Sequence, residues 1–78
     1  MKFLAEMTDT FGGEANYSWV ENASFELPDG ATDLKVVRRA KELLGLTGVK
    51  CDREEYGETI VLRPRNTCTI VFIDYVIE

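Results

Sequence analysis

The chain has no histidine among its 78 residues, and this absence excludes several kinds of active site. Histidine is the usual general base near neutral pH and the commonest neutral metal ligand, and a Ser–His or Cys–His nucleophile requires it. Two lone cysteines, Cys51 and Cys68, do not make a zinc site. The pair Gly12-Gly13 lacks the Gly-Lys-Ser/Thr ending of a phosphate-binding loop. An enzyme that uses only carboxylates needs a cleft around them, for which so short a chain has little room. We therefore predict that the protein is not an enzyme and has no catalytic residues, metal or cofactor.

The chain also lacks long hydrophobic runs. The longest, residues 70–73, has four residues, whereas a membrane-spanning helix needs about 20. The first residues do not form a secretory signal, because Glu6 interrupts them. We therefore expect a cytoplasmic protein with no membrane partner. In that compartment Cys51 and Cys68 should be reduced, buried thiols, with a disulfide between them as the alternative.

The length and composition fit one domain. Hydrophobic residues make up 45% of the 78 residues, which is enough for one core and not for two. We expect residues 1–78 to form a single domain.

Alternation of apolar and polar residues predicts two strands in the first third of the chain. They cover residues 2–10 and 15–27, and the turn between them contains paired glycines. So short a connection favours an antiparallel hairpin. The alternation of the second strand is broken at Val20 and Glu21, which predicts a bulge or a bend near these residues.

Residues 32–45 have the pattern of an amphipathic helix. Thr32 is a good N-cap and Gly45 fits the left-handed position after a helix. An apolar stripe should face the core, and it consists of Val36, Val37, Ala40, Leu43 and Leu44.

Strands return after the helix, over residues 49–54, 59–63 and 68–77. The last is apolar on both faces, which is typical of a central strand. We predict an α+β fold in which a single helix packs on a mainly antiparallel sheet of four to five strands, in the order ββ-α-βββ. The residues expected between helix and sheet are Phe3, Met7, Tyr17, Trp19, Phe25, Ile60, Leu62, Ile70 and Phe72. Those expected on the uncovered sheet face are Leu4, Val20, Val61, Val71, Ile73 and Tyr75.

Charge is distributed unevenly along the chain. Residues 32–45 carry four basic and two acidic residues, while the rest carries five basic and twelve acidic ones. The densest acidic cluster, which we predict to bind the partner, is Asp52, Glu54, Glu55 and Glu58. Its spacing does not match an EF-hand, but acidic rows can imitate nucleic-acid phosphates and occupy a basic groove. The alternative site is the basic helix face, Lys35, Arg38 and Arg39, which could contact phosphates directly.

Two stretches, FGGEANYSW at residues 11–19 and LGLTG at residues 44–48, make the chain similar to small accessory proteins encoded by phages and prophages. The resemblance implies a protein that binds and disables a host machine, for example a CRISPR–Cas complex, in the host cytoplasm. We therefore predict a small acidic, non-enzymatic binding protein that inhibits a host protein complex, with nucleic-acid mimicry as one mechanism of that inhibition. The first alternative is a protein that self-associates, for example as a homodimer, through the bare sheet face or residues 68–77. The second is a weak nucleic-acid binder that uses the basic helix face.

Overall fold

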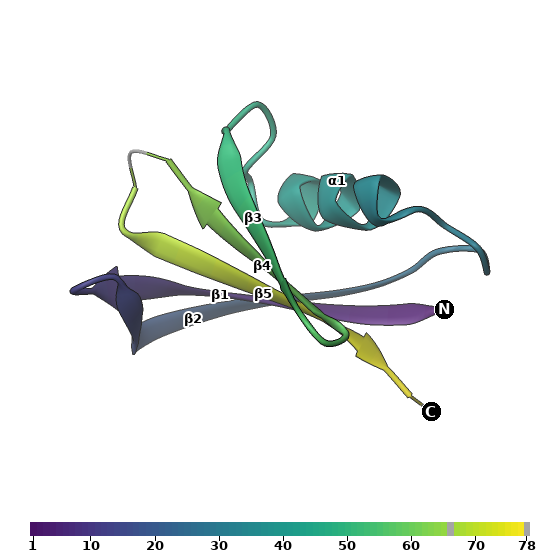
Figure 1. Ribbon diagram of the computed structural model, residues 1–78, viewed down its shortest axis with the longest axis horizontal. Helices are drawn as coiled ribbons and strands as arrows, with labels where there is room; N and C mark the ends of the chain where they lie inside the picture. The colour runs from purple at the N-terminus through teal and green to yellow at the C-terminus, as the bar shows by residue number, and fades with distance from the viewer. Residues whose placement is uncertain (66, 78) are drawn as a thin grey trace.

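The computed structural model describes residues 1–65 and 67–77, which form one sheet and one helix (Figure 1). The order of the elements along the chain is the predicted ββ-α-βββ. Their bounds are β1 (Lys2–Phe11), β2 (Glu14–Glu26), α1 (Asp33–Leu43), β3 (Cys51–Tyr56), β4 (Thr59–Pro64) and β5 (Thr69–Val76).

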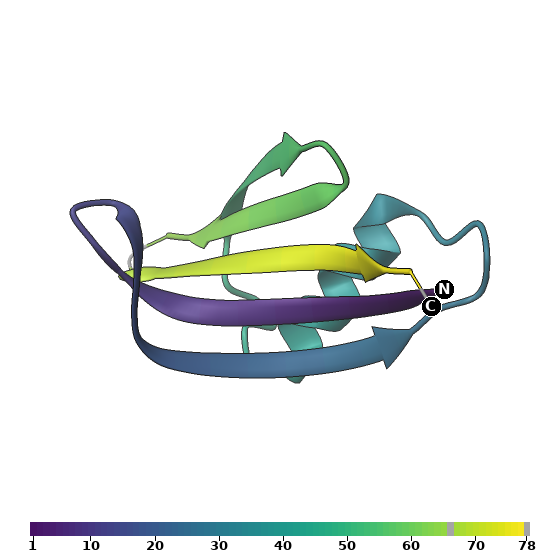
Figure 2. The same ribbon diagram turned by 90° about the horizontal axis from the view of Figure 1, so that it is seen from below.

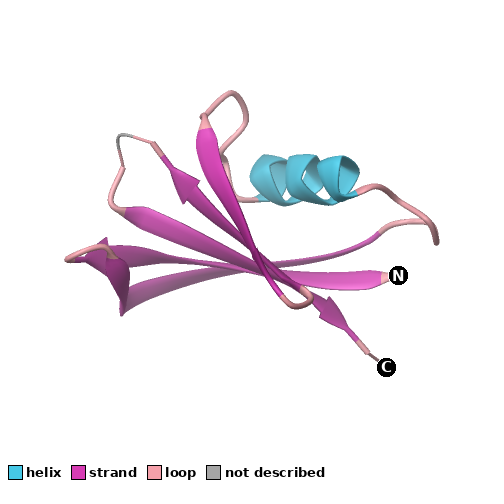
Figure 3. Ribbon diagram, in the orientation of Figure 1, coloured by secondary structure: helices cyan, strands magenta, loops and turns pink. Residues whose placement is uncertain are grey.

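The molecule is mostly β, so the prediction of an α+β fold is wrong. All five strands join one antiparallel sheet in the order β2-β1-β5-β4-β3, and the only helix among the described residues has 11 residues (Figure 3). The helix is the connection between the two edge strands, β2 and β3. It crosses one face of the sheet on the way, and the strands supply most of the core.

Both predicted ends of the helix are confirmed. The Oγ1 atom of Thr32 accepts a hydrogen bond from the backbone N–H of Lys35 at 3.3 Å, as an N-cap does. At the other end Gly45 has a φ of +73°, and the N–H of Leu46 donates to the carbonyl of Lys41 at 2.7 Å. This closure satisfies carbonyls that the helix itself leaves free.

The core lies between α1 and one face of the sheet. Val36 and Ala40 are 2% and 0% exposed and pack against side chains from β1, β2, β4 and β5. Phe3 stacks on Phe25 with ring centroids 5.4 Å apart. The predicted core positions on β1 and β4 are therefore confirmed, together with Phe25.

The faces of β5 were predicted the wrong way round. Ile73 pairs with Ala5 of β1 and with Ile60 of β4, and directly paired residues share a face, so Ile73 faces the helix. Val71 lies on the same side, while Ile70 and Phe72 lie on the opposite one. Both faces of β5 carry large apolar residues, and the one charged residue, Asp74, lies on the same face as Ile70 and Phe72, away from the helix. The predicted central place of β5 in the sheet is confirmed.

A large bulge distorts the β1–β2 hairpin. Thr8 pairs with Val20, but Thr10 already pairs with Ala15, so residues 16–19 stand opposite Asp9 alone. The bulge therefore lies just before the predicted position at Val20 and Glu21. It breaks the period-two pattern, and for this reason the predicted burial of Tyr17 and Trp19 is wrong: both are exposed.

The sheet face opposite the helix is only partly bare. Leu4 and Val20 are exposed there as predicted, whereas Val61 is 3% exposed. Arg63 Nη1 donates to the carbonyl of Gly13 at 2.9 Å, which ties the tip of the β1–β2 hairpin to β4. Figure 2 shows this tip turned toward the end of β4. Tyr75, predicted on this face, pairs with Phe3 and lies on the helix side with Val71 and Ile73.

Candidate protein-binding site

Three aromatic side chains are exposed on the β1–β2 hairpin. Phe11, Tyr17 and Trp19 are 81%, 55% and 43% exposed. The hairpin tip projects at the end of the molecule opposite the two termini (Figure 2). Large rings are normally placed in a core, and small soluble domains rarely gather them on one projecting segment without a partner. We refer to Phe11, Tyr17 and Trp19 as the aromatic hairpin.

A network around Asp9 holds the bulge that presents these rings. Asp9 Oδ1 accepts from the backbone N–H of Ser18, and Asp9 Oδ2 accepts from Asn16 Nδ2, both at 2.9 Å. The hydrogen bonds from Ser18 and Asn16 hold the pKa of Asp9 well below its usual range. Thr8, which is completely buried, donates from Oγ1 to the carbonyl of Trp19 at 2.8 Å. The backbone of the aromatic hairpin is thus fixed by several hydrogen bonds, although Tyr17 has a φ of +57°.

The predicted acidic cluster does not form one continuous acidic row. Asp52 and Glu54 lie on the bare face of the sheet, whereas Glu55 lies on the helix side and Glu58 lies in the β3–β4 turn. Alternate residues of a strand point to opposite faces, so one strand cannot present all four together.

Three of these carboxylates are also paired with arginines. Asp52 Oδ1 lies 2.8 Å from Arg65 Nη2, and Glu54 Oε1 lies 3.2 Å from Arg63 Nε. Glu55 Oε1 lies 2.5 Å from Arg53 Nη2. The pKa of Asp52 is lowered by the hydrogen bond from Arg65, and that of Glu54 mainly by the hydrogen bond from the Tyr56 hydroxyl. The carboxylates are therefore charged but largely neutralised by their neighbours, which weakens their likeness to a row of phosphates.

The basic helix face is exposed to solvent. Arg39 Nη1 lies 3.1 Å from Glu42 Oε2 one turn later. Lys35 and Arg38 are exposed and form no ion pair with another residue in the described part of the chain. Lys41, in contrast, donates from Nζ to the carbonyl of Val49 at 2.6 Å and so holds the loop before β3.

The two cysteines are free thiols, as expected. Cys51 is half-buried, and burial raises its pKa. Cys68 is exposed, so the prediction that both are buried is wrong for Cys68. Among residues 1–65 and 67–77, no three Cys, Asp or Glu side chains are grouped as a metal ion would require. In the same part of the chain, no helix is long and apolar enough to cross a membrane.

Comparison with known proteins found no matching family model, no similar curated protein and no similar solved structure. The resemblance to phage accessory proteins therefore stays a prediction.

The aromatic hairpin was missed because the bulge was expected near Val20 and Glu21, and residues 15–19 were interpreted as regular strand. Signals were nevertheless present in the sequence. Asn16 and Ser18, which favour turns and local hydrogen bonds to the backbone, interrupt the aromatic residues. Gly12-Gly13 on the other strand also marks a hairpin end.

Proposed function

We propose that this protein is a small non-enzymatic binding module that recognises a protein partner through the aromatic hairpin. The observation that carries the proposal is the exposure of Phe11, Tyr17 and Trp19 on a bulged segment whose backbone is held by hydrogen bonds. Tyrosine and tryptophan are enriched among the residues that dominate binding energy in protein interfaces. A segment that is already rigid loses less conformational entropy on binding.

Charge favours a protein partner over nucleic acid. The chain has a net charge of −5, and Glu14 and Glu21 lie on the same hairpin. These carboxylates repel phosphates, and the arginine nearest the hairpin tip, Arg63, is already paired with Glu54 and the carbonyl of Gly13. Proteins that bind single-stranded nucleic acid combine stacking rings with a positively charged groove, and a net charge of −5 disfavours that combination.

The resemblance of residues 11–19 and 44–48 to phage accessory proteins predicts the partner to be a host protein complex, such as CRISPR–Cas, that is inhibited on binding. The aromatic hairpin lies within the first of these stretches. Inhibition would follow if the bound hairpin covers a working surface of the host complex.

Self-association is the second candidate. One of its two proposed routes is narrowed, because β5 pairs with β1 along its whole length and with β4 over residues 71–73. The other route is the bare sheet face, where Leu4 and Val20 are 37% and 45% exposed. Light scattering at high micromolar concentration tests it: a monomer would exclude the homodimer.

Affinity capture with matched variants tests the proposed function. The tagged protein, with Phe11→Ser, Trp19→Ser and the control Tyr56→Ser, is incubated at low salt with lysate of the source cells, or of the host. Tyr56 is 62% exposed on a different hairpin, so the control removes an equally accessible ring. Loss of an interface hot spot costs about 2 kcal/mol or more, which is roughly a 30-fold loss of affinity.

The expected result is one partner retained by the wild type and by Tyr56→Ser but lost by Phe11→Ser and Trp19→Ser. Equal retention by all four proteins would contradict the role of the aromatic hairpin. A variant with reversed charge at all four residues of the acidic cluster tests mimicry in the same assay. If only this variant fails to retain the partner, the interface is the acidic cluster, Asp52, Glu54, Glu55 and Glu58, and not the aromatic hairpin.

A further inference from the structure

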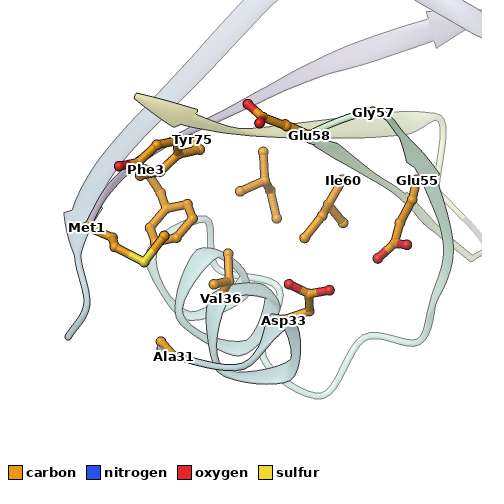
Figure 4. A pocket seen from close by; sticks show the side chains of 11 residues that line it. Met1, Phe3, Ala31, Asp33, Val36, Glu55, Gly57, Glu58, Ile60 and Tyr75 are labelled. Atoms are coloured by element: carbon orange, nitrogen blue, oxygen red, sulfur yellow. The ribbon is translucent and has the colours of Figure 1, made fainter. Parts of the chain in front are cut away.

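A cleft opens between the start of α1 and the β3–β4 hairpin (Figure 4). Its volume is about 420 Å³, within the range of ordinary small-ligand pockets. The floor is apolar: Val36 comes from α1, Ile60 from β4 and Ile73 from β5, and each is at least nine-tenths buried. The cleft exists because α1 covers the β2 side of the sheet, while β3 and β4 diverge from the helix (Figure 1).

Three carboxylates surround the opening of this cleft. Asp33 begins the helix, Glu55 lies on β3 and Glu58 lies in the β3–β4 turn. Figure 4 shows Asp33 and Glu55 on one side of the cleft and Glu58 at its edge. The cleft thus combines an apolar interior with a negatively charged rim.

The rim already binds a cation of the protein itself. Arg53 Nη2 lies 3.1 Å from Asp33 Oδ2 and 2.5 Å from Glu55 Oε1. The hydrogen bond from Arg53 lowers the pKa of Glu55, so this carboxylate is charged at neutral pH. Glu58 is exposed and makes no ion pair or hydrogen bond with any other described residue. One guanidinium is therefore shared by two of the three carboxylates, and Glu58 is the one that stays available.

We propose that this cleft binds an arginine or lysine side chain of a protein partner. The aliphatic stem would lie along Val36, Ile60 and Ile73, and the charged head would reach Glu58 at the rim. Long basic side chains bury their stems on apolar surface in this way while the charge stays near water. A neutral apolar ligand would leave the rim unused, and an anion would be repelled by it. This site lies at the opposite end of β1 from the aromatic hairpin and does not depend on it.

NMR titration with small capped peptides tests the proposal. The probe is acetyl-Gly-Arg-Gly-amide, and the control is the same peptide with citrulline, which has the shape of arginine but no charge. We expect saturable shifts of the methyl signals of Val36, Ile60 and Ile73 with the arginine peptide at millimolar concentration. The citrulline peptide should bind several-fold more weakly, and added salt should weaken only the arginine peptide, because salt screens exposed charges.

Two variants that each remove one negative charge test whether the charged head of the ligand binds at Glu58. Glu58→Gln should weaken the arginine peptide about two- to fivefold, the effect of losing one exposed ion pair. Glu14→Gln, an identical change at the distant hairpin tip, should leave its affinity unchanged. The proposal is overturned if the arginine and citrulline peptides bind equally, if Glu58→Gln behaves as Glu14→Gln does, or if no shifts appear at these methyl groups up to about 20 mM peptide.

Discussion

Replacing Thr8 by valine tests whether the buried hydroxyl holds the bulge of the aromatic hairpin. Thr8 is 0% exposed, and its Oγ1 donates to the carbonyl of Trp19 at 2.8 Å. Its distance to Asp9 Oδ1 is longer, 3.3 Å, and a hydroxyl has one proton, so the bond to Trp19 is the one expected to form. Valine has nearly the same shape, so Thr8→Val removes the donor without creating a cavity.

The expected loss follows from the cost of one hydrogen bond. A buried hydrogen bond contributes about 1 kcal/mol net, and the loss approaches about 3 kcal/mol if the carbonyl it leaves behind is not reached by water. A 78-residue domain has a total stability of about 4 to 12 kcal/mol. We therefore expect Thr8→Val to lower the free energy of unfolding by about 1 kcal/mol and the melting temperature by about 4–8 °C.

Urea unfolding followed by circular dichroism measures this change. Trp19 is the only tryptophan, so its fluorescence reports on the bulge directly. Thr10→Val is the matched control, because Thr10 lies two residues along the same strand and its side chain makes no hydrogen bond within the described residues. If Thr8→Val is as stable as Thr10→Val and leaves the fluorescence of Trp19 unchanged, the hydroxyl does not hold the bulge.

Three further predictions concern the core, the helix end and the response to acid. Leu62→Ala, at a site 1% exposed, should cost about 2–5 kcal/mol in urea unfolding, and a loss below about 1 kcal/mol would contradict its place in the core. Gly45→Ala should cost about 1 kcal/mol in the same assay, because a side chain is strained at a φ of +73°; unchanged stability would mean that the helix end relaxes freely. The pKa values of Asp9, Asp52 and Glu55 are lowered in the folded protein, so the folded state binds fewer protons than the unfolded one. Their contribution to the free energy of unfolding is fully present above the pKa values of the unfolded state, which are about 4. It is lost as pH falls below these values toward the pKa values of the folded state. The melting temperature should therefore be constant near neutrality and fall below about pH 4.5, and it should fall less for Asp9→Asn than for the wild type. Equal falls for the two proteins would show that the Asp9 network does not contribute to stability.

Local signals in the sequence predicted the helix better than they predicted the sheet faces. Thr32 and Gly45 act through backbone groups within a few residues, so their roles do not depend on the rest of the fold. The faces of β5 depend on its register with β1 and β4, which are far away in the sequence. Both faces of β5 carry large apolar residues, so either orientation buries apolar surface, and packing against the helix selects Val71 and Ile73.

The candidate sites show the same limit. The acidic residues near the β3–β4 turn were identified from the sequence, but their pairing with Arg53, Arg63 and Arg65 was not. Two of these arginines come from β4 and the residue after it, and they reach the acids only because β3 and β4 form a hairpin. The aromatic hairpin was hidden by a bulge that takes Tyr17 and Trp19 out of the regular pairing with β1 and leaves them exposed.

The sequence by itself determined the order of the elements, the helix ends, and the absence of histidine chemistry, because these depend on residue identity and short-range contacts. Tertiary structure alone decided the strand order, which face of β5 is covered, and which charges are neutralised. It also turned aromatic residues expected in the core into an exposed site and opened the cleft beside α1. These properties arise from contacts between segments that are distant in the chain. The local sequence pattern does not determine which of these segments pair or in which register.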